Sequence, residues 1–304
     1  MYKFIKTISV LVTVCYFGGS VVLANSMTVK EFVDTQDMSM QLEQIVIPGK
    51  GEGVSVSTLN GTGYVFNVPM PIANIFLKKE CCNGKRVVDI GCGFNYIPIK
   101  ALENGVSEYV ANDISSDHLK ILVKKAMSVL DENKLANLRM LHGSAPSILA
   151  ELDGKYDAIF ADKVIHFFSP SEIKDFVNLT KNLLTEKGRI YVTVSSVYGI
   201  LGQNDDYKTT YLQNLKNGKE FPGYFTDVFS KFKEFGNDSI IILPEQMILF
   251  SKTDLENFFK INGMKVVHSC SLRVLHKDEL GWEIVENESH NNYSDFIEIV
   301  VEKC

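Results

Sequence analysis

The sequence predicts an α/β fold built on a doubly wound, largely parallel sheet. Short apolar runs typical of buried parallel strands recur along the chain, and stretches with helical periodicity separate them. With 304 residues, of which 45% are hydrophobic, the chain is long enough to bury one large core. One large domain carrying an insertion is therefore favoured over two domains.

A strand, a glycine loop and a helix start follow one another early in the chain. Residues 87–90 form a short apolar run with Asp89 near its end, as expected of a buried strand. Gly91 and Gly93 carry no Cβ, so the backbone there can turn sharply and approach a ligand closely. Pro98 fits the first turn of a following helix, whose N-terminus would direct free N–H groups at the ligand.

This stretch resembles the first motif of the class I S-adenosylmethionine-dependent methyltransferases, in which an acidic residue precedes Gly-x-Gly by one position. Asp89, Gly91, Cys92 and Gly93 match that pattern. A dinucleotide-binding fingerprint fits less well, because it needs a third glycine where Tyr96 stands. The acid would also repel a pyrophosphate, whereas it suits the ammonium of a methionine moiety. The resemblance implies that the cofactor is S-adenosyl-L-methionine and that Asp89 and the glycines hold its methionine end.

The next cofactor residues also follow from this resemblance. Asn95 stands where the family often has another glycine, and asparagine tolerates the left-handed backbone that such a loop needs. Asp113 lies at the tip of a predicted strand, residues 108–112, and matches the family's ribose-binding acid. As an alternative, Asp113 is a charge that complements the N-terminus of the next helix. Ile114 matches the apolar residue beside the adenine.

The third and fourth predicted strands, residues 138–142 and 156–161, supply the remaining cofactor residues. Ser144 stands where the family commonly has an acid that accepts from the adenine amino group, and Ala145 follows it. Asp162 begins the loop after the fourth strand. In a doubly wound sheet this loop borders the ligand crevice, so Asp162 is expected near the cofactor.

The acceptor side is predicted more loosely. His166, in the loop after the fourth strand, is a candidate general base near neutral pH. Alternatively, proximity and alignment alone drive the transfer. Tyr64 belongs to a hairpin predicted around Asn60-Gly61, and Tyr198 and Tyr224 lie in an irregular segment, where the family inserts a substrate cap. The alternative for Tyr64 is packing of the hairpin on the core, and the alternative for Tyr198 and Tyr224 is packing in the insertion's own core.

Strand order completes the fold expected from the resemblance. Residues 189–194 are a fifth strand, and residues 264–270 and 296–301 are the last two, separated by a polar excursion. The resemblance implies a Rossmann-like sheet of seven strands, mostly parallel with the last strand antiparallel. The predicted organisation is an N-terminal cap of a helix and a hairpin over residues 25–70, and a methyltransferase domain over residues 71–304 with a cap insertion at about 198–250.

Residues 1–24 stand apart from this domain. Lys3 and Lys6 precede an apolar run that ends in Val-Leu-Ala, which predicts a secretory signal peptide and an exported protein. A membrane anchor is the alternative, because the run is nearly long enough to span a bilayer. Another alternative is cytoplasmic protein translated from a later start, at Met27.

Cysteine usage conflicts with export to an oxidising space. The cysteines beyond residue 24 are odd in number and irregularly spaced, which does not predict a disulfide framework: Cys81, Cys82, Cys92, Cys270 and Cys304. No Cys-x-x-Cys pair or histidine cluster in the sequence predicts a metal. The formal charge of −6 argues against a broad nucleic-acid-binding surface. Membrane contact is expected only through the N-terminal segment, and the oligomeric state is left open.

The predicted function is methyl transfer from S-adenosyl-L-methionine to an unidentified acceptor, expected to be a small molecule. Two alternatives remain from the sequence. One is a nicotinamide-dependent oxidoreductase, which the residue at the third glycine position disfavours. The other is a module that binds the cofactor without turnover.

Overall fold

The computed structural model describes residues 26–36, 44–46, 55–61, 63–66, 70–82, 84–199, 204–228, 244–277, 281–287 and 294–304. The predicted signal or anchor segment, residues 1–24, lies outside these ranges. Among the helices that are described, none has the length and apolar character needed to cross a membrane.

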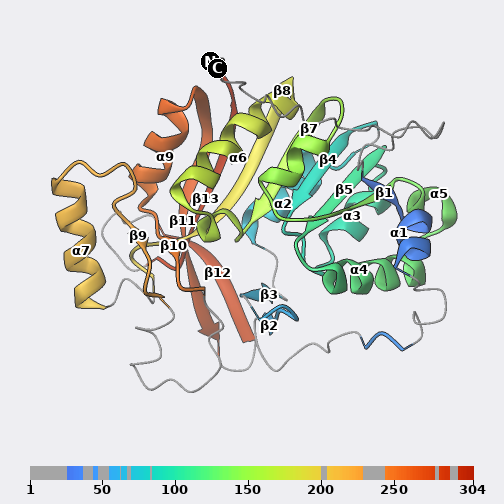
Figure 1. Cartoon of the computed structure of the whole chain (residues 1–304), viewed down its shortest axis with the longest axis horizontal. Helices are drawn as coiled ribbons and strands as arrows, with labels where there is room; N and C mark the ends of the chain where they lie inside the picture. The colour runs from blue at the N-terminus through green and yellow to red at the C-terminus, as the bar shows by residue number, and fades with distance from the viewer. Residues whose placement is uncertain are drawn as a thin grey trace, which may run out of the picture.

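A nine-stranded sheet forms the centre of the molecule (Figure 1). Its spatial order is β1 (Met27–Thr28), β6 (Leu138–His142), β5 (Glu108–Asp113), β4 (Arg86–Ile90), β7 (Tyr156–Asp162), β8 (Leu184–Ser195), β13 (Phe296–Lys303), β11 (Met264–Lys277) and β12 (Gly281–Asn287). From β6 to β8 all neighbours are parallel, whereas β13 is antiparallel to both β8 and β11. The seven inner strands confirm the expected sheet with its antiparallel last strand.

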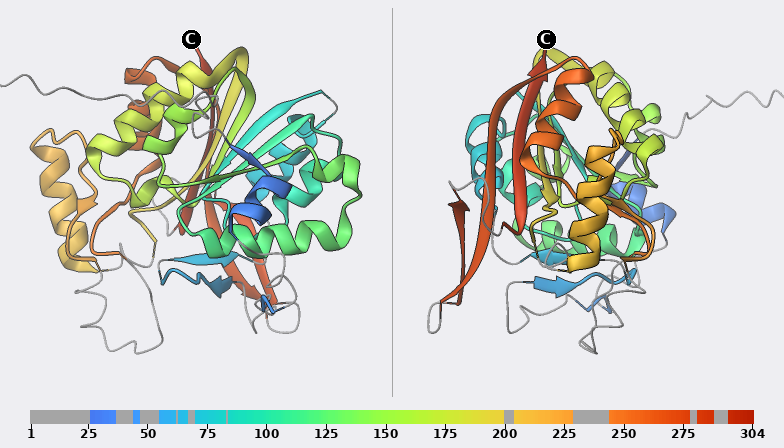
Figure 2. Two further views of the ribbon diagram at one scale, coloured as in Figure 1. Left: turned by 45° about the vertical axis from the view of Figure 1, so that its right-hand side comes forward. Right: turned by 90° about the vertical axis from the view of Figure 1, so that its left-hand side faces the viewer.

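Two further strands extend this sheet at its edges. β1 pairs with β6, and β12 pairs with β11, both antiparallel. The sequence predicts a strand only over residues 264–270, but β11 continues to Lys277 and, with β12, projects beyond the body of the sheet (Figure 2). Part of the predicted polar excursion is therefore β-structure.

Helices cover both faces of the sheet, as a doubly wound fold requires (Figures 1 and 2). One face packs against α1 (Val29–Thr35), α2 (Pro71–Lys79), α3 (Ile97–Glu103) and α4 (Ser116–Val129). The other packs against η1 (Ser147–Glu151), α6 (Pro170–Leu183) and α9 (Lys252–Ile261). Short α5 (Glu132–Leu135) leads into β6, and η2 (Ile165–Phe167) follows β7.

Local capping explains where several helices begin. A capping box opens α6: the hydroxyl of Ser169 accepts the Glu172 N–H, and the Glu172 carboxylate accepts the Ser169 N–H at 2.7 Å. A second capping box joins Ser251 and Asp254 at the start of α9. These two caps fix where α6 and α9 begin.

Two smaller units lie beside the sheet. The predicted hairpin is present as β2 (Ser55–Ser57) paired with β3 (Tyr64–Phe66). The segment after β8 contains α7 (Asp205–Lys216), β9 (Tyr224–Phe225) and β10 (Met247–Ile248). Its apolar residues form their own cluster, which includes Tyr207, Tyr211 and Phe225. Several aromatic side chains of this segment therefore pack against one another.

Candidate cofactor and acceptor site

A cavity of about 730 Å³ lies at the carboxyl ends of β4, β5, β6 and β7. This is where the strand order reverses, because β4 leads through α3 to β5 on one side and has β7 on its other side. Ligands of doubly wound proteins bind at such a switch point. The cavity wall includes the glycine loop after β4 and the loop after β7, as well as part of the β2–β3 hairpin.

The backbone of the glycine loop can come close to a ligand in the cavity. Gly91 has a φ of +63° and Gly93 a φ of +56°, in the left-handed region that favours glycine. A Cβ on Gly91 would lie 2.1 Å from Cγ2 of Val164, in the loop after β7. The N–H of Cys92 donates to the carbonyl of Asn112 at 2.9 Å, which fastens the loop to β5.

Asn95 lines the cavity but does not act as the sequence analysis expected. The one non-glycine residue with positive φ in the described chain is Lys163, so the expected left-handed backbone at Asn95 is wrong. Instead, Oδ1 of Asn95 accepts the Ile97 N–H at 2.8 Å. This bond satisfies one of the free N–H groups at the start of α3. The side chain, rather than backbone freedom, therefore shapes this part of the loop.

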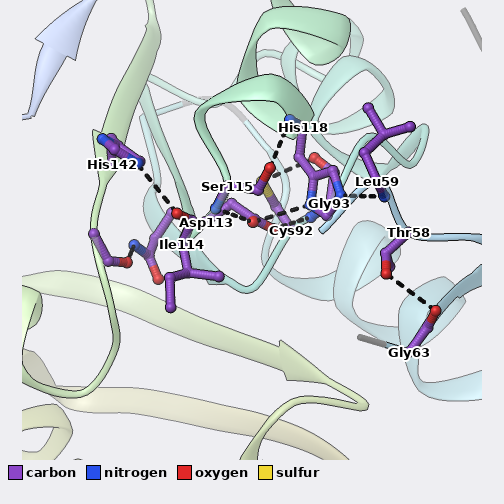
Figure 3. Close-up of polar contacts among 12 residues, drawn as sticks. Thr58, Leu59, Gly63, Cys92, Gly93, Asp113, Ile114, Ser115, His118 and His142 are labelled. Atoms are coloured by element: carbon purple, nitrogen blue, oxygen red, sulfur yellow. Dashed lines mark hydrogen bonds and ion pairs between the residues drawn. The ribbon is translucent and has the colours of Figure 1, made fainter. Parts of the chain in front are cut away.

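Asp113 is buried at the end of β5 and organises the loops around it (Figure 3). Its Oδ2 accepts the Gly93 N–H at 2.8 Å, and its Oδ1 accepts the Ser115 N–H at 2.8 Å. Ser115 is the N-cap of α4, so Asp113 also lies at the helix start, where the alternative interpretation places its charge. A carboxylate has about four lone-pair sites, and these two bonds together with one from His118 occupy three of them, which leaves acceptor capacity on Oδ2 for a ribose hydroxyl.

His118 connects this acid to the hairpin (Figure 3). Its Nδ1 lies 3.0 Å from Oδ1 of Asp113, and its Nε2 lies 3.0 Å from the backbone nitrogen of Leu59. Because the Leu59 N–H donates to Nε2, the imidazole proton sits on Nδ1 and donates to Asp113. Sequence reasoning missed His118, since no pattern indicates that a helix histidine meets a hairpin backbone.

Asp89 lies away from the cavity. Side chains alternate along a strand, so Val88 and Ile90 face one layer while Asp89 and Val87 face the other. The Asp89 carboxylate is buried and accepts the Tyr109 hydroxyl at 2.7 Å. Burial raises its pKa well above the ordinary value. The expected contact of Asp89 with the methionine end is therefore wrong for this structure. Asp89 instead makes a structural contact beneath the glycine loop.

The predicted adenine residues are brought together. Ile114, Ser144 and Ala145 all line the cavity, and the Ile114 side chain is 59% exposed. The Ser144 hydroxyl donates to the carbonyl of Ala145 at 3.3 Å. These residues come from the ends of neighbouring strands β5 and β6, which explains their proximity. Their contacts with adenine stay a prediction.

Asp162 presents the clearest acceptor in the wall. It lines the cavity, and its Oδ2 pairs with the Lys163 ammonium. Its Oδ1 is buried and has no hydrogen-bond partner among the described residues. A buried acceptor without a donor is costly, so this oxygen suits an N–H donor such as the ammonium of S-adenosyl-L-methionine. Nearby Tyr96, which the sequence analysis did not assign, also lines the cavity. Burial and the Asp162 charge raise its pKa to about 12.

His166 lines the cavity as a neutral ring. It is buried, and its Nδ1 accepts the Ser195 N–H at 3.4 Å. Burial, with a contribution from Lys163, lowers its pKa to about 3. At pH 7 the ring therefore carries no charge and is a weak base. A role as a general base that titrates near neutral pH does not fit this environment.

The three tyrosines predicted on the acceptor side do not all lie at the cavity. Tyr64 of the hairpin lines the cavity, whereas Tyr198 and Tyr224 do not. The Tyr224 hydroxyl donates to Oε1 of Gln246 at 3.0 Å, and the Tyr198 ring meets the Tyr211 ring within the segment after β8. Apolar wall residues that the sequence analysis did not assign are Phe167, Phe168, Met247 and Leu249. They come from segments without strong periodicity, so no sequence signal indicates them.

The chain is similar in sequence to a known protein family and to several known proteins. Residues 87–188 match a family model described as a methyltransferase domain. The chain is similar to the ribosomal protein L11 methyltransferase of Thermotoga neapolitana, 26% identical over 169 residues, which are 51% of this chain and 58% of the relative. A protein of the same name from Acetivibrio thermocellus is 34% identical over 88 residues, covering 29% of this chain and 26% of that protein. The aligned part is about half the length of the first curated relatives.

A solved structure shares the fold. An S-adenosylmethionine-dependent methyltransferase from Methanosarcina mazei superposes with a TM-score of 0.50 at 16% identity, covering 77% of this chain and 98% of that one. This likeness shows the fold. The match of residues 87–188 to the methyltransferase domain shows that the chain carries a class I S-adenosylmethionine-dependent methyltransferase domain, with S-adenosyl-L-methionine as its cofactor.

Proposed function

We propose that the protein transfers the methyl group of S-adenosyl-L-methionine to a small-molecule acceptor held in the same cavity. The observation that carries the proposal is the cavity itself. At about 730 Å³ it has the size of a small-molecule site, and its wall combines the cofactor loops with aromatic side chains. Tyr64, Phe167 and Phe168 supply that aromatic wall. They suit an organic acceptor with an apolar body.

Each end of the cofactor has residues of matching chemistry in this proposal. Oδ1 of Asp162 accepts from the methionine ammonium, and Gly91 and Gly93 let the backbone approach the cofactor closely. Asp113 accepts from a ribose hydroxyl, and Ile114 packs beside the adenine. The cofactor supplies a methyl group bonded to a positively charged sulfur.

The protein contributes mainly position to the transfer. Holding the acceptor and the methyl group in line supplies up to about 7–11 kcal/mol of the barrier reduction. His166 stays neutral and offers the N–H of its Nε2 as a hydrogen-bond donor, because its Nδ1 accepts from Ser195. The ring therefore helps to orient the acceptor rather than to remove its proton.

A protein acceptor is the second candidate. Curated relatives are named ribosomal protein L11 methyltransferases, and this name supports a protein acceptor. In the Thermotoga neapolitana relative the similarity covers about half of each chain. The aromatic wall of the cavity favours the small molecule.

Two measurements test this proposal. Calorimetry with S-adenosylhomocysteine should give binding at one site per chain, and no binding would overturn the cofactor assignment. Methyl-labelled cofactor is then incubated with cell extract separated by size into small molecules and protein. Label in the small-molecule fraction supports the proposal, whereas label only in protein supports the second candidate.

We also propose that the protein is exported through residues 1–24. The basic residues Lys3 and Lys6 ahead of an apolar run support this location. The described cysteines are all free thiols, which suits a reducing destination that also supplies the cofactor. Fractionation with N-terminal sequencing tests this: a mature protein outside the producing membrane beginning at Asn25 supports export, and cytosolic protein beginning at Met27 overturns it.

A further inference from the structure

Three side chains from the last two inner strands of the sheet meet beside the start of α2. His268 and Cys270 belong to β11, and Glu298 belongs to β13. One donor atom of each lies within 4.8 Å of the other two. None of the three lines the cavity described above. They form a separate cluster, here named the β11–β13 cluster.

Strand geometry creates the β11–β13 cluster. Cys270 is directly opposite Glu298 in the antiparallel pair. His268 is two residues from Cys270, so both side chains point to the same face of the sheet. The register shifts just before His268, between Val266 and His268. Such bulges occur where a strand redirects a side chain.

Two polar atoms of the cluster are short of partners. Nε2 of His268 is buried and has no hydrogen-bond partner among the described residues. Leaving a buried nitrogen unpaired costs about 1–3 kcal/mol. The Glu298 side chain is fully buried, and the donor that reaches its Oε2 among the described residues is the weak thiol donor of Cys270, with Sγ at 3.8 Å. A cation between these atoms would satisfy all three groups.

We propose that His268, Cys270 and Glu298 bind a divalent transition-metal ion, Zn²⁺ first among them, with water as the fourth ligand. Zinc takes nitrogen, sulfur and oxygen ligands in tetrahedral sites, and its bond lengths place a bound sulfur and oxygen about 3.6 Å apart. The separation of 3.8 Å between Sγ and Oε2 is close to that value. Magnesium and calcium require oxygen ligands and do not suit this set.

The surroundings support a bound ion in two ways. The backbone N–H of Ile72 donates to Oε1 of Glu298 at 3.0 Å, which orients the carboxylate and leaves Oε2 for the metal. His268 and Cys270 are partly exposed, so an ion has a path from solvent.

A metal here would tie α2 to the sheet. Ile72 lies in the first turn of α2, and its neighbours Met70 and Ala73 line the cavity. Val274 and Phe296 of β11 and β13 line it as well. The β11–β13 cluster therefore lies directly behind one wall of the acceptor cavity. The inferred role is structural, and it does not depend on methyl transfer.

Metal binding can be measured without any acceptor. The full chain is freed of metal with a chelator and titrated with Zn²⁺ by calorimetry, and with Co²⁺ by absorption. One equivalent of each ion should bind, and Co²⁺ should produce the charge-transfer band of a cobalt–thiolate bond. Absence of binding, or Co²⁺ binding without the thiolate band, overturns the proposal.

Variants assign the ligands. Cys270→Ser should abolish the cobalt–thiolate band, and His268→Gln should weaken Zn²⁺ binding by more than about 100-fold, because even outer-shell changes cost 10- to 100-fold. Cys82→Ser is the control, since Cys82 is an exposed thiol elsewhere in the chain. Binding of S-adenosylhomocysteine reports whether each variant is folded. Retention of the thiolate band and of full Zn²⁺ affinity in folded Cys270→Ser and His268→Gln also overturns the proposal.

Discussion

His118 and Asp113 share a buried hydrogen bond, with Nδ1 of the histidine 3.0 Å from Oδ1 of the acid. The opposite nitrogen of the same ring accepts the Leu59 N–H from the turn of the hairpin. One imidazole thus joins the hairpin, the first turn of α4 and the acid that closes the glycine loop. The position of the hairpin over the cavity is therefore coupled to the proposed ribose-binding group.

His118→Ala should weaken cofactor binding although His118 is not a proposed ligand contact. Loss of a hydrogen bond to a charged group costs about 1.5–3 kcal/mol, which corresponds to about 10- to 100-fold in affinity. Calorimetry with S-adenosylhomocysteine measures the loss, and hydrogen exchange at the Leu59 amide reports release of the hairpin. Ser128→Ala, an exposed position on the same helix, is the control. Unchanged affinity and exchange would contradict the coupling.

The pair Asp113→Asn and His118→Ala isolates this coupling in a double-mutant cycle. Each hydrogen bond to the charged carboxylate that is lost should cost about 1.5–3 kcal/mol. Asp113→Asn alone should therefore reduce the affinity for S-adenosylhomocysteine by at least this amount, because Gly93 and Ser115 also donate to this acid. Because the two residues are in contact, the losses should not add. Additive losses would show that the histidine and the acid act independently.

The inner sheet could be predicted because its signals are local. Strands β4, β5, β6 and β7 are short apolar runs bounded by turns, and the box of Ser169 and Glu172 marks the start of α6. Edge strands carry no such signal. β1 has two residues, too few for any period, and β12 lies in a polar stretch whose pairing depends on β11.

Side-chain direction explains why part of the site escaped prediction. A continuous apolar run does not reveal which residues face which layer, so Asp89 could not be placed beneath the loop from the sequence. The place of Asp113 beside the cavity could be predicted because this residue ends a strand at the ligand crevice. His118 and the β11–β13 cluster depend on contacts between distant segments, which no local pattern encodes.

Gly91→Ala should damage the glycine loop more than its backbone strain alone predicts. An L-residue in the left-handed region costs about 1–2 kcal/mol. In addition, the new Cβ would overlap Val164 at 2.1 Å, so the loop after β7 must move. Gly218→Ala is a matched control, because Gly218 has a φ of +68° but no atom within 4 Å of a new Cβ. Urea unfolding and S-adenosylhomocysteine binding compare the two variants.

The Gly91 variant should lose both stability and affinity, whereas the Gly218 variant should lose only about 1–2 kcal/mol of stability, the strain of its backbone. Equal losses in stability with unchanged cofactor binding in both would show that the contact between the two loops has no influence on the site.

His166 should remain neutral throughout the physiological range. Its pKa of about 3 follows from burial and the nearby Lys163 ammonium. An NMR titration from about pH 5 to 8 should therefore show no shift of its ring protons, whereas an ordinary histidine titrates near 6.5. The ring-proton signal of His166 is assigned as the one that is missing from the spectrum of His166→Asn. That variant keeps an acceptor for the Ser195 N–H. A titration midpoint near 6.5 would restore His166 as a candidate general base.

Asp89 should make the protein less stable as the pH rises. Its carboxyl ionises near pH 4 in the unfolded chain, but burial holds its pKa well above that value in the folded protein. Above pH 4 the unfolded state therefore binds fewer protons than the folded state, and the free energy of unfolding falls with increasing pH until the folded pKa is passed. The slope is at most about 1.4 kcal/mol per pH unit for one group.

Urea unfolding of the wild type and Asp89→Asn at pH 5, 6 and 7 measures this contribution. The asparagine variant cannot ionise, so its unfolding free energy should decline less steeply with pH than that of the wild type. Asp131→Asn is the control: a backbone N–H from Lys134 lowers the pKa of Asp131, so its effect on stability is confined below about pH 4. Because that window lies outside the measured range, Asp131→Asn should keep the wild-type slope. Parallel curves for wild type and Asp89→Asn would mean that Asp89 is ionised in the folded protein, with a cation or solvent reaching the carboxylate that Tyr109 contacts.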